Sequence, residues 1–385
     1  MTLYRNTPLA FQIHGIEQLF LHLSLHHSAG AFEQSIGQSC LAVIDVSDDA
    51  KISNPFDVHH KRVDHAKFPA EKSKSIAGIK KNYFSDLLRM DKNRLKGTHT
   101  ALITPMVDGN VSFADLERHV ERQIASGVNG LVPCGTTGES PTLSPEEHLR
   151  VVEATVKASA GRTPIIAGTG ANSTSEAMHL TKAADEAGAD AFLLVAPYYN
   201  KPSQEGLLAH FGAIAEITEK PIVLYSIPSR CGIEISTSTV ARLYEKHPNI
   251  CAIKEAGGRS AKVSDTAVAL GSDYVILSGD DGLTLPFMAC GASGVISVAS
   301  NVYPAPIVKM VDLARANDFK SARKLHLEYL RVFGELFIEP NPVPAKFVMK
   351  TLGMIESDEV RLPLCGLQPE NSERLSRLAK DFPLH

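Results

Sequence analysis

The sequence predicts an α/β protein built as a TIM (β/α)8 barrel, with a small C-terminal helical appendage and an unstructured N-terminal extension. Eight apolar runs of strand length recur with helical patterns between them. The runs are continuously apolar, as a parallel sheet covered on both faces requires. They are TALITPM (100–106), GLVPCG (130–135), PIIAGTG (164–170), AFLLVAPYY (191–199), PIVLYSIP (221–228), ICAIKEA (250–256), YVILSGDD (274–281) and GVISVASN (294–301).

The segments between the first runs predict helices. Each opens on a serine, has an acidic residue in the first turn, and then repeats apolar residues at intervals of three and four. They are SFADLERHVERQIASG (112–127), SPEEHLRVVEATVKASAG (144–161), STSEAMHLTKAADEAGAD (173–190) and SQEGLLAHFGAIAEITEK (203–220). A doubly wound open sheet is the alternative, but no glycine-rich fingerprint follows the first strand. The pattern therefore favours the closed barrel.

The two ends of the chain differ from the periodic body. Residues 1–89 are rich in His, Ser and Lys and show no sustained period, so we expect a disordered extension or a mis-assigned start. Residues 90–303 should form the catalytic barrel. Residues 304–385 carry further helical periods, in FKSARKLHLEYLRVFGELF, PVPAKFVMKTLGM and PENSERLSRLAKDF, and should form the C-terminal helical subdomain.

Composition narrows the function classes. The 39 basic and 43 acidic residues give a net charge of −4 without a dense basic stripe, which argues against nucleic acid as a partner. The six cysteines form no CxxC pair, so neither a disulfide framework nor a structural zinc site is predicted. The most apolar N-terminal run is interrupted by polar residues and is too short to span a membrane. We therefore expect a cytoplasmic protein that does not associate with membranes.

The polar loops that follow five strands are the candidate site. They are GTTGES, PYYNKPS, YSIPSR, KEAGG and SGDD. In a barrel of this kind the chemistry lies at the C-terminal ends of the strands. We therefore expect these five loops to meet at one mouth.

Lys254 ends an apolar strand. An amine inside an apolar barrel loses solvation, which lowers its pKa and provides a neutral nucleophile that forms a Schiff base with a carbonyl. Glu255 should point to the opposite side of the strand, so an ion pair between the two is not implied. The alternative is that Lys254 extends out of the barrel end into solvent.

Hydroxyl groups accompany this lysine. Tyr225 and Tyr199 lie at strand ends, and Thr136 and Thr137 follow another strand. Hydroxyls facing an amine can relay protons during carbinolamine formation and dehydration. GTTGES can form an anion nest for a substrate carboxylate; alternatively, its threonines only cap the helix that begins at Ser144.

Arg230 lies where a second substrate would approach, and a guanidinium binds a carboxylate through two parallel hydrogen bonds. A surface arginine in a loop is the alternative. The paired aspartates of SGDD lack a third ligand, so no metal is predicted. GTGAN lacks the third glycine of a dinucleotide site, and the last two loops lack a phosphate cradle. The pattern predicts carboxylate substrates.

GTTGES, YYNKPSQEG, YSIPSR and IKEA, in this order and spacing, resemble the dihydrodipicolinate synthase family, also called 4-hydroxy-tetrahydrodipicolinate synthases, within the pyruvate-dependent class I aldolases. The resemblance runs from about residue 96 to the C-terminus. It implies a lyase that condenses pyruvate with L-aspartate 4-semialdehyde in lysine (diaminopimelate) biosynthesis. It also implies a homotetramer that needs no cofactor beyond the pyruvate Schiff base.

The resemblance also implies roles for individual residues. Lys254 would form the Schiff base with pyruvate, and Arg230 would orient the carboxylate of the semialdehyde. Tyr199 would act in the site of the neighbouring subunit. The proton relay would consist of Tyr225, Thr136 and Tyr199. Thr137 and its loop would hold the pyruvate carboxylate, and the backbone of Gly279 and Ile296 would line the pocket.

Some relatives bind lysine as a feedback inhibitor at a dimer interface. The matching positions here are Ser140, His148, Asn172, Glu176 and Tyr198. Pro141 and Pro145 depart from the residues that some sensitive relatives carry. From the residues alone, His148 is a helix-surface histidine. Lysine as an allosteric ligand is thus a hypothesis carried by the resemblance.

The amino-acid sequence is also compatible with other functions. Another pyruvate-dependent lyase, such as N-acetylneuraminate lyase or a keto-deoxy sugar acid aldolase, would share the lysine and the tyrosine, and Arg230 argues against it. A barrel that binds a ligand without catalysis is a further alternative. Met90 lies where members of the family begin, so we expect the true start there; a targeting or regulatory extension is the alternative.

Overall fold

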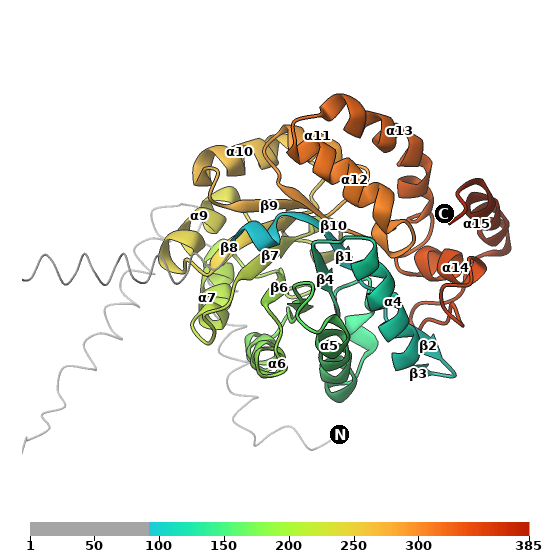
Figure 1. The fold of residues 1–385 in the computed structure, drawn as a ribbon. Helices are drawn as coiled ribbons and strands as arrows, with labels where there is room; N and C mark the ends of the chain where they lie inside the picture. The colour runs from blue at the N-terminus through green and yellow to red at the C-terminus, as the bar shows by residue number, and fades with distance from the viewer. Residues whose placement is uncertain (1–91, 385) are drawn as a thin grey trace, which may run out of the picture. The chain divides into compact units, whose positions relative to one another are not determined.

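The computed structural model describes residues 92–384, so the predicted extension over residues 1–89 lies outside the described residues. Eight parallel strands form one sheet: β1 (Gly97–Ala101), β4 (Gly130–Val132), β5 (Ile166–Gly168), β6 (Ala191–Val195), β7 (Ile222–Ser226), β8 (Ile250–Glu255), β9 (Val275–Ser278) and β10 (Gly294–Ser297). Their order is β4-β1-β10-β9-β8-β7-β6-β5. A parallel bridge from Leu131 to Ile165 joins the two outer strands. The sheet therefore closes, and the predicted barrel is confirmed (Figure 1).

Helices alternate with the strands and surround them (Figure 1). They are α4 (Phe113–Ala125), α5 (Pro145–Ser159), α6 (Thr174–Glu186), α7 (Gln204–Ala215), α8 (Pro228–Cys231), α9 (Thr237–Lys246), α10 (Ser260–Leu270), α11 (Thr284–Ala289) and α12 (Pro304–Arg315). The four helices predicted from their opening serines all form. Ser112, Ser144, Ser173 and Ser203 are their N-caps, and each accepts a hydrogen bond from the backbone N–H three residues later. These caps satisfy N–H groups that the helix itself leaves unpaired.

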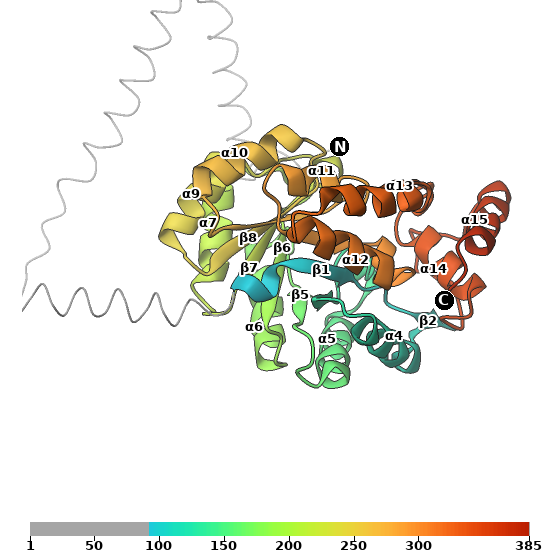
Figure 2. The same cartoon turned by 45° about the horizontal axis from the view of Figure 1, so that its top comes forward.

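The helical periods predicted after the eighth strand also form. They are α13 (Phe319–Glu335), α14 (Val343–Thr351) and α15 (Pro369–Asp381). Figure 2 shows α13 beside α12 and α14 beside α15, and both pairs are in contact. The predicted division into domains at residue 304 stays a prediction; α12, which begins there, lies against β1 and β10 and so covers barrel strands.

Short elements complete the described chain. A two-stranded antiparallel hairpin, β2 (Met106–Val107) with β3 (Asn110–Val111), follows β1. Three 3-10 turns are η1 (Lys92–Leu95), η2 (Ser140–Thr142) and η3 (Ala299–Asn301). Within residues 92–384, no helix has both the length and the apolar character that crossing a membrane requires. Strands β7, β8 and β9 are buried along their whole length. The polar groups at the ends of the strands are therefore the candidate residues of a functional site.

Candidate active site

Lys254 lies inside the barrel near the end of β8, and its residue is only 6% exposed. Its Nζ lies 4.1 Å from the centroid of the Tyr225 ring on β7. Burial lowers the pKa of this amine to about 8; the negative charge of Asp281 opposes the shift, and the positive charge of Arg230 adds to it. The structure therefore supports the buried amine that the sequence predicts and excludes the solvent-extended alternative.

Tyr225 connects this amine to the next strand end. Burial raises the pKa of Tyr225, while the charge of Arg230 and a hydrogen bond with Thr136 lower it. The phenol therefore keeps its proton at neutral pH and can both donate and accept hydrogen bonds. Lys254, Tyr225 and Thr136 thus form a series in which the amine lies against the tyrosine ring and the tyrosine hydroxyl is hydrogen-bonded with Thr136.

A cavity of about 210 Å³ opens beside this series. Its lining includes Thr136, Tyr225 and Arg230, together with Ser140 and Tyr198. Lys254 does not line the cavity itself, but its Nζ lies against the ring of Tyr225, which does. The loops GTTGES, PYYNKPS and YSIPSR therefore share one mouth, as predicted.

A second cavity, of about 480 Å³, adjoins the first one through Ile227 and Arg230. Ala256, Gly279 and Asp280 line it, so the KEAGG and SGDD loops also face this region. Arg230 is exposed and belongs to both cavities, which places a guanidinium between them. The site thus has room for two small molecules, with a cation at the junction.

Gly279 lies where the Lys254 side chain passes. A Cβ added to Gly279 would stand 3.1 Å from Cε of Lys254 and 2.7 Å from Cβ of Ala256. Any larger residue would therefore push on the lysine. Ile296 is buried on β10, in the barrel wall.

The SGDD aspartates have different surroundings. Asp281 is buried and accepts hydrogen bonds from the Ser297 hydroxyl at 2.5 Å and from the N–H groups of Val298 and Ala299 at 3.0 Å. Asp280 faces the second cavity. No group of three or more His, Cys, Asp or Glu side chains within residues 92–384 is arranged to hold a metal ion. Through its hydrogen bonds, the Asp281 carboxylate joins the loop after β9 to β10 and to the turn that follows β10.

Thr137 lies behind Thr136 and is buried. Its Oγ1 accepts a hydrogen bond of 2.9 Å from Nδ2 of Asn341, a residue about 200 positions later in the chain. Neither threonine caps α5, because the Ser144 side chain does so in a reciprocal capping box with Glu147. The capping interpretation of GTTGES is therefore wrong.

A buried ion pair that the sequence did not reveal fixes the same loop. Glu139 has a left-handed backbone, with φ of 55°, and its carboxylate contacts Nζ of Lys346 on α14 at 2.5 Å. Both side chains are fully buried, and the second Glu139 oxygen accepts from the backbone N–H of Arg361. Burial lowers the pKa of Lys346, and the charge of Glu139 opposes this shift. Lys346 on α14 and the segment after this helix thus hold the GTTGES loop in place.

Tyr199 is the predicted site residue that the described chain does not bring to the others. Its side chain is 89% exposed, and its backbone has a φ of 73°, a conformation that non-glycine residues seldom adopt. It does not line either cavity of the site. A strained loop thus presents a large aromatic ring to the outside of the protomer.

Two of the five residues of the predicted lysine site, Ser140 and Tyr198, line the first cavity. Nδ2 of Asn172 donates to the Tyr198 carbonyl at 3.3 Å. His148 is 6% exposed and lies 2.9 Å from the Gly168 carbonyl, so its description as a helix-surface histidine is wrong. Glu176 is exposed, and its charge helps raise the pKa of Tyr198, which burial raises most.

Comparisons with known proteins agree with this geometry. Residues 94–382 match the model of the dihydrodipicolinate synthetase family. A 4-hydroxy-tetrahydrodipicolinate synthase from Persephonella marina is 50% identical over 289 residues, covering 75% of this chain and 99% of that protein.

Two solved structures are similar over the same region. One is the chloride-inhibited dihydrodipicolinate synthase from Acinetobacter baumannii complexed with pyruvate, with a TM-score of 0.72, 44% identity, and coverage of 74% of this chain and 98% of that one. The other is the enzyme of this family from Cyanidioschyzon merolae with lysine bound, with a TM-score of 0.72, 36% identity and the same coverage. The chain described here belongs to the dihydrodipicolinate synthetase family.

Proposed function

We propose that this enzyme is a 4-hydroxy-tetrahydrodipicolinate synthase that condenses pyruvate with L-aspartate 4-semialdehyde in lysine biosynthesis. The observation that carries the proposal is the buried amine of Lys254, held over the Tyr225 ring at the end of a barrel whose mouth contains Arg230. Similarity to synthases at about half identity over nearly their whole length supports the same assignment. No cofactor enters the proposed reaction besides pyruvate bound covalently to Lys254.

The first half-reaction uses Lys254 as the nucleophile. Its neutral amine attacks the keto carbon of pyruvate, and the resulting carbinolamine loses water to give an imine. Tyr225 and Thr136 move the protons in this step, because their hydroxyls are hydrogen-bonded to each other and the amine lies against the Tyr225 ring. Thr137, Gly279 and Ile296 form the surroundings of the pyruvate end.

The second half-reaction forms the carbon–carbon bond. Loss of a methyl proton converts the imine into an enamine, whose carbon attacks the aldehyde of the semialdehyde. Arg230, between the two cavities, binds the carboxylate of this second substrate. The amino group of the product then closes the ring, which releases Lys254.

Arg230 also argues against the sugar-acid lyases. Its guanidinium can bind a carboxylate through two parallel hydrogen bonds, and a neutral polyol has no carboxylate to offer. We therefore prefer the semialdehyde to an amino sugar or a keto-deoxy sugar acid as the second substrate.

The proposed assembly is a homotetramer in the cytoplasm. Tyr199 supports this assembly, because its exposed ring and strained backbone suit a residue that completes the proton relay in a neighbouring subunit. Without such a neighbour the ring would stay in solvent.

The test of this function is a coupled assay that supplies pyruvate with either L-aspartate 4-semialdehyde or N-acetylmannosamine. Turnover with the semialdehyde alone is expected. Turnover with the amino sugar alone would contradict the proposal and indicate a sugar-acid lyase with the same Schiff-base lysine.

The pH dependence of kcat/KM for pyruvate should follow the protonation state of Lys254. Because burial lowers the pKa of Lys254 to about 8, its neutral fraction increases as the pH rises toward that value. We expect kcat/KM for pyruvate to rise about tenfold per pH unit below this pKa and to level off above it. Steady-state kinetics from about pH 6 to pH 10 measures this. A midpoint near the ordinary lysine value would show that the amine is solvated.

We further propose that lysine binds at Ser140, His148, Asn172, Glu176 and Tyr198 as a feedback inhibitor. The carboxylate of Glu176 is exposed and would meet the ligand ammonium group. Titration calorimetry with millimolar lysine should show heat that Glu176→Gln removes, while His179→Gln, an exposed change on the same helix, keeps it. Absence of heat with the wild type would remove the proposal.

A further inference from the structure

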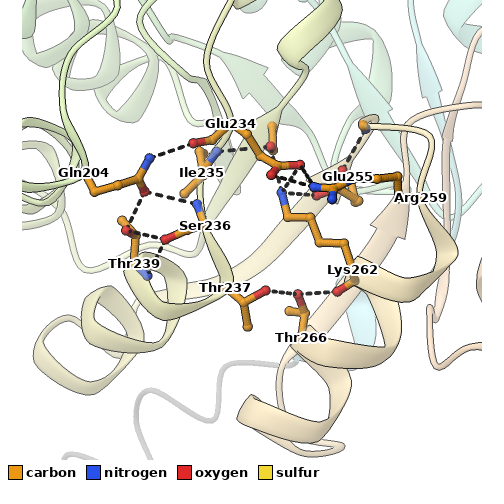
Figure 3. Close-up of polar contacts among 12 residues, drawn as sticks. Gln204, Glu234, Ile235, Ser236, Thr237, Thr239, Glu255, Arg259, Lys262 and Thr266 are labelled. Carbon is orange, nitrogen blue, oxygen red and sulfur yellow. Dashed lines mark hydrogen bonds and ion pairs between the residues drawn. The ribbon is translucent and has the colours of Figure 1, made fainter.

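A cluster of charged side chains joins the end of β8 to α10 and to Glu234 (Figure 3). Lys262 on α10 is its centre, with Nζ at 2.8 Å from Oε2 of Glu255 and 3.2 Å from Oε1 of Glu234. The Lys262 and Glu255 side chains are 6% and 3% exposed. We call Glu234, Glu255 and Lys262 the ion cluster.

The strand register connects this cluster to the reacting groups. On the paired strands β7 and β8, Tyr225 stands opposite Lys254, and Ser226 stands opposite Glu255. Because successive side chains point to opposite faces, the first pair faces the barrel interior and the second faces outward. Nζ of Lys262 also donates to the Ser226 hydroxyl at 3.2 Å. One ammonium group therefore ties together the two residues that adjoin Tyr225 and Lys254.

The cluster also fixes the turn that carries Arg230. This turn leaves β7 at Ser226 and ends at Glu234. At its far end, the Ile235 N–H donates back to the Ser226 hydroxyl at 3.3 Å. Glu234 is further held by Nη2 of Arg259, which donates to both carboxylate oxygens at 2.7 Å. Figure 3 shows these contacts joining the turn to α10.

The loop after β8 is attached to the same carboxylate. The Gly257 N–H donates to Oε1 of Glu255 at 2.7 Å. A Cβ on Gly257 would stand 2.6 Å from this oxygen and 3.3 Å from Oε1 of Glu234, so the backbone needs glycine to approach so closely. The ion cluster therefore contacts every backbone segment that carries Tyr225, Arg230 and Lys254.

The energetic cost of burying charges indicates that the ion cluster fixes the positions of the segments that it joins. Burying the charges of Glu255 and Lys262 costs solvation, and apolar side chains of similar volume often stabilise a fold as well or better. A buried ion cluster does, however, allow few alternative arrangements of the segments it joins. We propose that Glu255 and Lys262 are positioning residues that set the distance between the Lys254 amine and the Tyr225 hydroxyl for Schiff-base formation. This inference rests on the proposed function.

The test measures Schiff-base formation directly in the full chain. Protein is mixed with pyruvate, quenched with borohydride at increasing times, and the trapped adduct is counted by intact mass. Glu255→Gln keeps the side-chain volume and leaves Lys262 paired with Glu234, so the fold should persist. We expect its rate constant to fall about tenfold or more, because small misplacements of reacting atoms are costly. The final amplitude should stay that of the wild type.

The amplitude and the rate constant of adduct formation together distinguish a positioning effect from a loss of folded protein. A change that only unfolds part of the sample lowers the amplitude and leaves the rate constant of the remaining molecules unchanged. The matched control is Glu205→Gln, which removes an exposed carboxylate that pairs with Arg242 between α7 and α9. Its rate constant should stay within about twofold of the wild type.

A second variant, Lys262→Met, should slow adduct formation as well, and its rate constant is read only from the molecules that react.

The proposal is overturned if Glu255→Gln reacts at the rate of Glu205→Gln, or if only its amplitude falls. Absence of a pyruvate adduct in the wild type would overturn the proposed function and this role together. An adduct in the wild type with equal rates in the variants would overturn the cluster's role alone.

Discussion

Replacing Lys254 by alanine is expected to abolish turnover of pyruvate with L-aspartate 4-semialdehyde. The amine is the nucleophile of the proposed reaction, and loss of a nucleophile lowers kcat by about four orders of magnitude or more. The barrel should stay folded, because the change removes a buried amine whose charged form is penalised by desolvation. The coupled assay measures turnover, and far-UV circular dichroism measures the fold.

Lys201→Ala is the matched control for this experiment. Lys201 is exposed in the PYYNKPS loop, so it is a lysine near the same mouth without a buried amine. Its loss should change turnover only a few-fold, and borohydride should still trap pyruvate on Lys254. Wild-type turnover by Lys254→Ala would contradict the Schiff-base mechanism.

Replacing Lys346 by methionine is expected to destabilise the protein by about 3–5 kcal/mol, because it leaves the Glu139 carboxylate buried without its partner. The affected loop contains Thr136 and Thr137, so kcat/KM for pyruvate should fall as well. Urea unfolding at a fixed protein concentration measures the stability, since the concentration affects the apparent stability of an oligomer.

Lys350→Met tests the same chemistry on the surface of the same helix. Lys350 pairs with Asp358 at 2.8 Å, and the two side chains are 49% and 31% exposed. An exposed pair of this kind contributes about 1 kcal/mol or less. If both variants unfolded at the same urea concentration as the wild type, the buried pair would not hold the GTTGES loop.

Local patterns were sufficient for the secondary structure and for part of the site. Each of the four opening serines caps its helix, because a cap depends on a residue and its neighbours within one turn. The alternation of side chains along β8 correctly separated Lys254 from Glu255. Parallel strands direct their C-terminal ends to one rim, so the loops that share a mouth could be predicted from strand order alone.

Contacts between distant segments could not be predicted in this way. Glu139 and Lys346 lie 207 positions apart, and nothing in GTTGES indicates which cation neutralises its glutamate. His148 has the sequence context of a surface residue but is buried against Gly168. The exposure of Tyr199 depends on a left-handed backbone that its residue type does not favour.

Periodicity, capping and strand alternation act within a few residues, so the barrel, its helix caps and the buried lysine at the end of β8 could be predicted from the amino-acid sequence. The contacts between charges on the outer side of the strands, and those of C-terminal residues with the GTTGES loop, became visible only in the folded protein. Buried ions need partners in three dimensions. Glu255 finds its partner on α10, the helix that follows β8, and Glu139 finds its partner on α14, 207 positions later in the chain.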